Sequence, residues 1–256
     1  MRKIDHILHF RADISSFLVH LTRSIAGVRS GKEALLSILR EKKLICGSTQ
    51  VSDARFGRYT LDMTDEDRKL FFSAICFTET PLNEIHCLLE IAYRQIDLEP
   101  YGLVFLKERL QDCGISPVLY LNNEQGDKDP VIRSLCSLID TQPEPAAKFL
   151  PLLAVFGQKL TAPGALPSSD PKVDFRWEGE WRLPSVNGSL QFDLQDVFIG
   201  LCPHDEIDEF EAILPPLKFV DPTRNMKWYA TKLIEARQRL DIKFLYSFQT
   251  WVILFR

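Results

Sequence analysis

The order of strand-like and helical segments constrains the fold of this chain more than any other feature. Apolar and β-branched runs predict strands near residues 4–10, 74–78, 101–106, 117–121, 173–183, 189–194, 197–201 and 241–255. Helical spacing and start signals predict helices at 31–43, from Thr80-Pro81, after Asp129-Pro130, after Glu144-Pro145, and at 205–213 and 224–239. Regular β-α-β alternation is absent, and there is no Gly-x-Gly-x-x-Gly or Walker sequence, so a doubly wound nucleotide fold is not supported. The sequence therefore predicts an α+β fold with a mostly antiparallel sheet.

Local signals give some of these segments defined ends. Ser30 followed by Glu33 is a capping-box pattern at the start of the helix over 31–43. Thr80 is the expected N-cap of the next helix, with Pro81 at the first helical position. Gly102 permits close approach of another backbone or of a ligand. The segment 161–171, rich in Pro, Ser and Gly, is expected to be a linker or a mobile loop.

Length and charge limit the class of protein. The 256 residues fit one large domain, and we expect a single domain over 1–256 with a helical insertion at about 127–160. Apolar residues make up 45% and charged residues 26%, which is ordinary for a globular protein. The formal charge of −4 lacks the basic excess of a DNA-coating protein, although local basic patches leave nucleic acid open as a substrate.

The lack of targeting signals and the pattern of the cysteines indicate a cytoplasmic protein. Charged residues interrupt the N-terminus too early for a secretory signal, and no uncharged apolar stretch is long enough for a transmembrane helix, so no membrane partner is expected. The six cysteines contain no Cys-x-x-Cys pattern, and we expect free, buried thiols in a reducing cytosol.

The strongest sign of chemistry is the run Trp177-Glu178-Gly179-Glu180-Trp181-Arg182. On a strand, alternate side chains face the same side, so Glu178, Glu180 and Arg182 are expected to share one face. Two carboxylates roughly 7 Å apart on such a face can have different catalytic roles. One can stabilise a cationic sugar-like transition state, and the other can orient a nucleophile. Arg182 would keep Glu180 ionised and fixed. A solvated charged strand face over buried tryptophans explains the same pattern, and the sequence leaves both interpretations open.

Weaker signals point to ligand-binding side chains. Thr78 lies where a strand passes directly into a helix start, a junction that favours anions. His9, at the end of the first predicted strand, is placed to donate to a ribose hydroxyl or a carboxamide. Tyr101 and Tyr120 are suited to stack on a planar ring. Purely structural roles (a cap, a strand histidine, core packing) remain open for each of these residues.

Taken together, several short segments stand in a familiar order. They are His9-Phe10, Leu36 to Glu41 with Leu44, Cys76 to Leu82, Tyr101 to Phe105 with Lys107, and Glu178 to Arg182. This order resembles the AbiGi-type abortive phage resistance family and related bacterial proteins with a Glu-x-Glu-Trp-Arg signature, over roughly residues 5–200. The resemblance implies a part in phage defence, in a toxin–antitoxin setting.

The pattern also looks like a divergent ADP-ribosyltransferase, a class with a split antiparallel sheet and flanking helices that uses NAD as substrate. The resemblance implies catalytic roles for Glu180 and Glu178. The NAD-binding residues that it implies are His9, Arg11, Thr78, Tyr101 and Arg182. The acceptor would be a macromolecule: RNA, DNA or protein. The sequence has no Ser-Thr-Ser run, and the tyrosine of the His-Tyr-Glu branch has no certain counterpart.

Two other functions are compatible with the sequence. The first is a non-enzymatic antitoxin or interaction protein of an abortive-infection system, in which Glu178, Glu180 and Arg182 form a structural ion cluster. The second is a nuclease that uses paired carboxylates and a metal ion, for which Asp193, Asp196 and Asp205 are the nearest candidates. A toxic enzyme would in addition need an antitoxin or regulatory partner protein.

Overall fold

The computed structural model describes residues 15–25, 27–48, 63–91, 98–122, 130–156 and 175–242. The predicted first strand at 4–10, the segment 161–171 and nearly all of the predicted last strand lie outside these residues.

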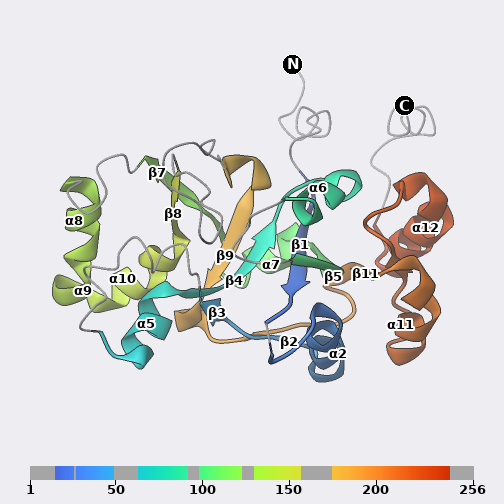
Figure 1. Cartoon of the computed structure of the whole chain (residues 1–256), viewed down its shortest axis with the longest axis horizontal. Helices are drawn as coiled ribbons and strands as arrows, with labels where there is room; N and C mark the ends of the chain where they lie inside the picture. The colour runs from blue at the N-terminus through green and yellow to red at the C-terminus, as the bar shows by residue number, and fades with distance from the viewer. Residues whose placement is uncertain are drawn as a thin grey trace, which may run out of the picture.

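A large mixed sheet forms the centre of the described molecule (Figure 1). Its strands are β1 (Phe17–Arg23), β3 (Gly47–Ser48), β4 (Ser73–Thr78), β5 (Leu98–Leu106), β6 (Ser116–Pro117), β9 (Glu180–Pro184), β11 (Val197–Leu201) and β12 (Phe219–Val220). The strand order is β12-β11-β5-β1-β4-β9-β6, and β3 pairs with β4. The α+β class and the mostly antiparallel pairing are confirmed.

One pair in the large sheet departs from antiparallel pairing. The pair β11–β12 is parallel, because the chain returns through α11 (Ile207–Ile213) before it enters β12.

A smaller unit lies at the left of Figure 1. Its strands β7 (Leu119–Asn122) and β8 (Leu153–Phe156) pair in parallel, and between them run α8 (Pro130–Cys136), α9 (Leu138–Thr141), α10 (Pro143–Phe149) and the 3-10 turn η3 (Leu150–Leu152). These helices fall within the range predicted for a helical insertion. With α5 (Asp65–Phe72) they bury a hydrophobic cluster of their own, which includes Phe72, Ile132 and Leu150.

The main hydrophobic core lies against the large sheet. The helix α2 (Gly31–Glu41) packs Leu35 and Leu39 onto it, and the predicted capping box is confirmed: Glu33 N donates to Ser30 Oγ (3.2 Å), and Ser30 N donates to Glu33 Oε2 (2.8 Å). The short helices α6 (His86–Leu89) and α7 (Lys107–Gln111) follow β4 and β5. A two-residue ribbon pairs β2 (Lys43–Leu44) with β10 (Leu190–Gln191). At the right of Figure 1 lie α11 and α12 (Ala230–Arg239).

Two predicted elements are wrong at their ends. The helix expected from Thr80 is only a 3-10 turn, η1 (Leu82–Glu84), followed by α6, and no side chain caps η1. The strand expected over 173–183 begins at Glu180, because the 3-10 turn η4 (Phe175–Glu178) precedes it and Gly179 adopts φ +52°. A left-handed residue of this kind cannot continue an extended strand, and glycine adopts that conformation without strain.

Gly102 marks a close approach of two backbones, as the sequence predicts. A Cβ atom at this position would lie 2.3 Å from the carbonyl oxygen of His20 on the neighbouring strand β1. Any side chain at position 102 would therefore push the two central strands apart.

We expect Gly102→Ala to lower the free energy of unfolding by about 3 kcal/mol, because the added methyl group overpacks the contact between β1 and β5. Urea unfolding followed by circular dichroism measures this loss. Gly47→Ala is the matched control, because a Cβ there would lie 3.4 Å from the nearest atom, at the end of the flexible Arg23 side chain. Equal stability of the two variants would contradict the close approach at Gly102.

Candidate functional site

The pairing of β4 with β9 brings together two residues that the sequence singled out. Thr78 and Glu180 are register partners, and Cys76 is the partner of Arg182. Because side chains alternate along a strand, these four residues belong to one face of the sheet, and Phe77 and Trp181 belong to the opposite face. Phe77 is part of the main core and Trp181 packs against it.

The centre of this face is an ion pair between Glu180 and Arg182. Arg182 Nε donates to Glu180 Oε1 (2.9 Å) and Nη2 donates to Oε2 (2.8 Å), so the contact is bidentate. Arg182 is only 3% exposed, whereas the Glu180 side chain is 19% exposed. Burial acts to lower the pKa of Arg182, but the Glu180 carboxylate, together with Cys76 and Tyr120, outweighs burial and the pKa is raised. The expectation that Arg182 fixes Glu180 is thus confirmed as a contact.

Arg182 also joins the sheet to the smaller unit. Its Nη1 donates to the carbonyl oxygens of Pro151 (2.8 Å) and Leu153 (3.0 Å), which precede and begin β8. Tyr120, on β7, lies near the same charged side chains. Burial is the main cause that raises the pKa of its phenol, and the negative charges of Glu180 and Glu178 raise it further. The phenol is therefore neutral at physiological pH. The hydrogen bonds of Arg182 place the carboxylate–guanidinium pair between the sheet and the β7–β8 unit.

Glu178 is not on the strand, so the predicted shared face of Glu178, Glu180 and Arg182 is wrong. Glu178 ends η4 and is buried, and its backbone carbonyl accepts hydrogen bonds from the hydroxyls of Thr78 and Thr80. Thr80 is therefore bound to the turn before β9 and does not cap a helix. The Thr78 hydroxyl also accepts the Thr80 N–H (3.0 Å).

A second polar cluster lies on the opposite face, and the sequence interpretation gave two of its members, Glu79 and Lys107, no role in the site. Lys107 Nζ pairs with Glu79, Trp181 Nε1 donates to Glu79 Oε2 (2.9 Å), and Nζ lies 5.0 Å from the centroid of the Trp181 ring. Glu79 and Lys107 each directly follow a strand, β4 and β5. Their position after two apolar strands is the sequence signal that could have identified them.

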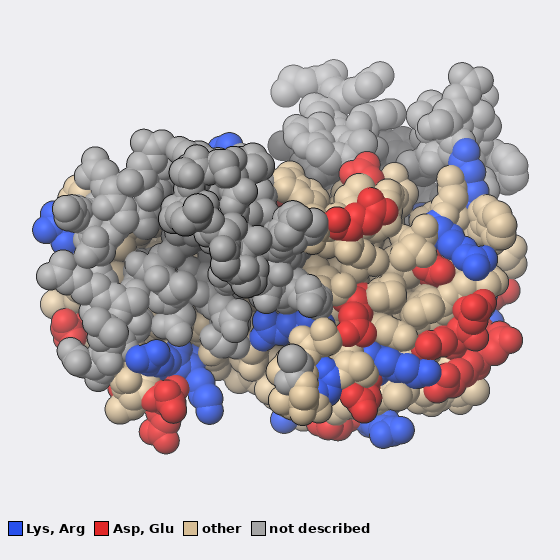
Figure 2. Space-filling model, viewed as in Figure 1, with Lys and Arg blue, Asp and Glu red and all other residues tan. Residues whose placement is uncertain are grey.

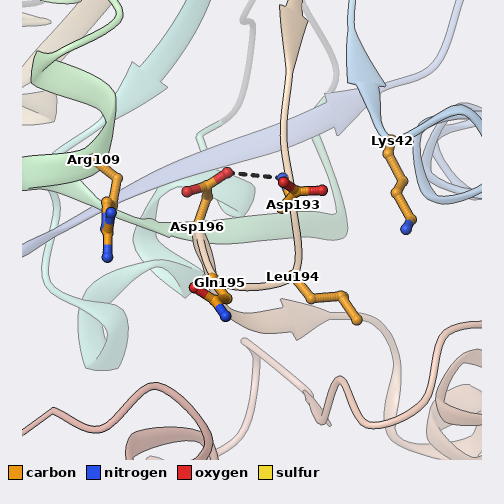
Figure 3. Close-up of a pocket in the computed structure, with 6 residues that line it drawn as sticks. All are labelled: Lys42, Arg109, Asp193, Leu194, Gln195 and Asp196. Atoms are coloured by element: carbon orange, nitrogen blue, oxygen red, sulfur yellow. Dashed lines mark hydrogen bonds between the residues drawn. The ribbon is translucent and has the colours of Figure 1, made fainter.

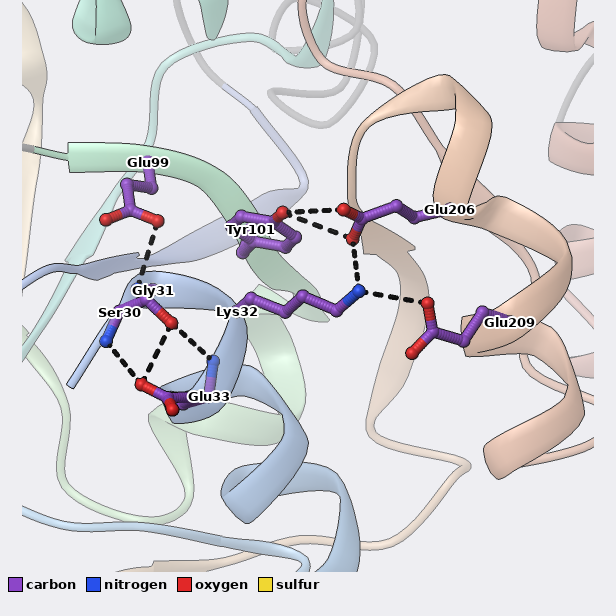
Figure 4. A network of polar contacts seen from close by, with 8 residues as sticks. All are labelled: Ser30, Gly31, Lys32, Glu33, Glu99, Tyr101, Glu206 and Glu209. Atoms are coloured by element: carbon purple, nitrogen blue, oxygen red, sulfur yellow. Dashed lines mark hydrogen bonds and ion pairs between the residues drawn. The ribbon is translucent and has the colours of Figure 1, made fainter.

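Tyr101 lies in a separate network (Figure 4). Its hydroxyl donates to both carboxylate oxygens of Glu206 (3.2 and 3.1 Å), and Lys32 bonds to Glu206 (3.2 Å) and Glu209 (2.9 Å). Burial and the Glu206 carboxylate raise the pKa of Tyr101 to about 12. The strands β1 and β4 separate Tyr101 from Glu180 in the sheet, so the structure does not bring these two predicted site residues together. His9 and Arg11 lie outside the described residues.

A cavity of about 500 Å³ lies elsewhere, and none of the predicted NAD-site residues that the structure describes lines it (Figure 3). Its lining residues are Lys42, Arg109, Asp193, Leu194, Gln195 and Asp196. Asp193 N donates to Asp196 Oδ2 (2.8 Å), so these two candidates of the nuclease hypothesis share a turn. In the part of the chain that the structure describes, no three His, Cys, Asp or Glu side chains are grouped to hold a metal ion.

In comparisons with known proteins, the sequence matches no family model, no curated protein and no solved structure. Within the described residues, no helix has the length and apolar character needed to cross a membrane.

All six cysteines are free, but they differ in burial. Cys136 and Cys202 are buried, Cys87 and Cys113 are exposed, and Cys46 and Cys76 are intermediate, so the expectation of buried thiols is wrong for the exposed pair. Burial raises the pKa of Cys76 to about 12, with a further contribution from the Glu180 carboxylate. Burial also raises the pKa of Cys136 and Cys202 to about 12.

In the folded protein at about pH 8, we expect iodoacetamide to modify Cys87 first, and Cys76, Cys136 and Cys202 only after unfolding. The reactive species is the thiolate, which a thiol of such high pKa rarely forms at this pH. Peptide mass spectrometry over a time course measures the order. Early modification of Cys76 would show that the interface between β9 and the β7–β8 unit opens in the native state.

Proposed function

We propose that this chain is an NAD-dependent ADP-ribosyltransferase that acts as a phage-defence toxin effector on a macromolecular acceptor, RNA among the candidates. The observation that carries the proposal is the register of β4 and β9, which pairs Thr78 with a Glu180 carboxylate that is fixed by Arg182 and partly exposed. The mostly antiparallel sheet with flanking helices supports an ADP-ribosyltransferase-like fold.

In this mechanism the bond between nicotinamide and ribose breaks, and nicotinamide leaves with the bonding electron pair. The ribose carbon becomes cationic, and an anion beside it lowers the barrier. Glu180 accepts a hydrogen bond from the ribose 2′-hydroxyl and stabilises that charge. A carboxylate has about four acceptor positions, so Glu180 can do this while Arg182 occupies one position on each oxygen.

The other residues hold NAD or the acceptor. Thr78 lies beside Glu180 and is assigned to the ribose and nicotinamide end, together with His9, while Arg11 is assigned to the pyrophosphate. Glu178 is assigned to orient the acceptor nucleophile and to take its proton as that nucleophile bonds to the ribose carbon. Arg182 positions Glu180. Tyr101 has no part in this mechanism, because Glu206 holds its hydroxyl at a different place in the sheet.

Glu180→Gln should reduce transfer of label from NAD by about a thousandfold, because the amide carries no charge to stabilise the ribose cation. The measurement is transfer of labelled NAD to separate pools of RNA, DNA and cell protein, with unfolding temperatures recorded for each variant. Glu108→Gln, at an exposed position on α7, is the control and should keep wild-type turnover. Wild-type turnover in a folded Glu180→Gln variant would refute the role of Glu180.

A second function is favoured by one specific observation. Arg182 binds both oxygens of Glu180 and two backbone carbonyls, which is the arrangement of a structural ion cluster in a non-enzymatic antitoxin or interaction protein. For such a protein, folded wild-type chain that is free of any inhibitory partner consumes no NAD and labels no pool. The same experiment therefore separates the two functions.

A further inference from the structure

The parallel strands β11 and β12 end side by side. Leu201 pairs with Val220, and α11 connects the two strands as a β-α-β unit. In open, mostly parallel α/β sheets, ligands bind in the crevice outside the carboxyl ends of the strands, at a topological switch point. The carboxyl ends here lead into Cys202-Pro203-His204 and Asp221-Pro222-Thr223-Arg224. These two segments therefore follow the same end of the parallel pair, as the ligand-binding loops of such sheets do.

Asp221 fixes the two segments to each other. It is 6% exposed, its Oδ2 accepts the backbone N–H of His204 (3.1 Å), and its Oδ1 accepts the N–H (2.8 Å) and hydroxyl (2.6 Å) of Thr223. Arg224 Nε lies 3.5 Å from Oδ2. The charge of this carboxylate is thus compensated within the fold, and its hydrogen bonds hold the two segments together.

The groups at this surface are an indole, a guanidinium and an imidazole. Trp228 is 73% exposed, and the Arg224 guanidinium carbon lies 5.7 Å from the centroid of its ring. The terminal nitrogens of Arg224 have no partner among the described residues. His204 is exposed and its Nδ1 is hydrogen-bonded to the Tyr229 hydroxyl (2.9 Å), while Nε2 has no partner within the described part of the chain. An indole with so much free surface is unusual on a folded protein, and its face can stack on any nucleobase.

The acidic residues nearby are largely neutralised. Asp and Glu side chains gather at the lower right of Figure 2, over α11. Lys32 pairs with Glu206 and Glu209, and Lys218 and Lys232 pair with Glu211. Asp205 and Asp208 have no such partner among the described residues. Arg224 contacts Asp221 only through Nε, so its terminal nitrogens and the exposed Lys227 can bind a phosphate, whereas Asp205, next to His204 in the sequence, adds a negative charge.

We propose that the carboxyl ends of β11 and β12 form a nucleotide-binding surface, in which the base stacks on Trp228 and the phosphate binds Arg224 and His204. The ligand is a nucleotide, either free or as one unit of a single-stranded RNA. This surface lies outside the β4–β9 site, and its existence does not depend on the activity proposed for Glu180.

Two probes distinguish the two sources of the nucleotide. Calorimetry with AMP tests a free nucleotide, and fluorescence anisotropy with a short, labelled single-stranded RNA tests a strand. Trp228→Ala should weaken binding of the responding probe about tenfold, whereas Trp228→Phe keeps most of the affinity, because an aromatic face remains. Arg224→Ala should weaken binding of both probes, and should lower the dependence of log K on log salt for RNA by about 0.7. Asp205→Asn should strengthen binding, because it removes a negative charge next to His204 in the sequence.

Controls of the same kind lie on other elements. Ile45→Ala removes a 68% exposed side chain that follows β2, and Arg40→Ala removes an exposed charge at the end of α2; both should bind as the wild type does. Equal binding by Trp228→Ala and Ile45→Ala would overturn the proposal. The proposal would also be overturned if the folded wild type binds neither AMP at about 1 mM nor RNA at about 100 µM. The RNA concentration of about 100 µM is the weak limit of non-specific nucleic-acid binding.

Discussion

The arrangement of the two hydrophobic clusters depends on the contacts of the buried Arg182 guanidinium. An arginine withdrawn from water is costly unless charge and hydrogen bonds replace its hydration. Glu180 supplies the charge, and the carbonyls of Pro151 and Leu153 supply further acceptors. The sheet and the β7–β8 unit are therefore joined by a polar contact that needs all three partners. Either proposed function has to operate with this constraint, because Glu180 cannot move far without leaving a buried cation uncompensated.

Elements with complete local signals were predictable from the sequence. The helix α2 carries its own capping box and apolar stripe, and β4 and β11 are short apolar runs, so their ends agree closely with the prediction. The contact of Glu180 with Arg182 was also predictable, because a spacing of two on a strand places side chains on one face. The close approach at Gly102 followed from the absence of a side chain.

What the sequence could not give depends on contacts between distant segments. Thr78 and Thr80 bond to the carbonyl of Glu178, about a hundred residues away, and this contact accompanies the turn that delays the start of β9. Tyr101 and Glu206 are likewise far apart in the chain, so nothing near Tyr101 in sequence shows that its hydroxyl is engaged. Of the residues predicted for the candidate site, Thr78 and Glu180 are neighbours in the sheet, whereas the predicted position of Glu178 on the strand is wrong.

The position of β9 in the sheet has a consequence for synthesis of the chain. Each strand edge that lacks a neighbour exposes backbone groups that other chains can pair with. β4 has β1 and β3 as partners, which precede it in the sequence, but its remaining neighbour is β9. A nascent chain on the ribosome therefore carries β4 with one open edge until Pro184 has been made. A premature stop before Glu180 would leave that edge permanently unpaired, and such a fragment would be a target for chaperones and proteases.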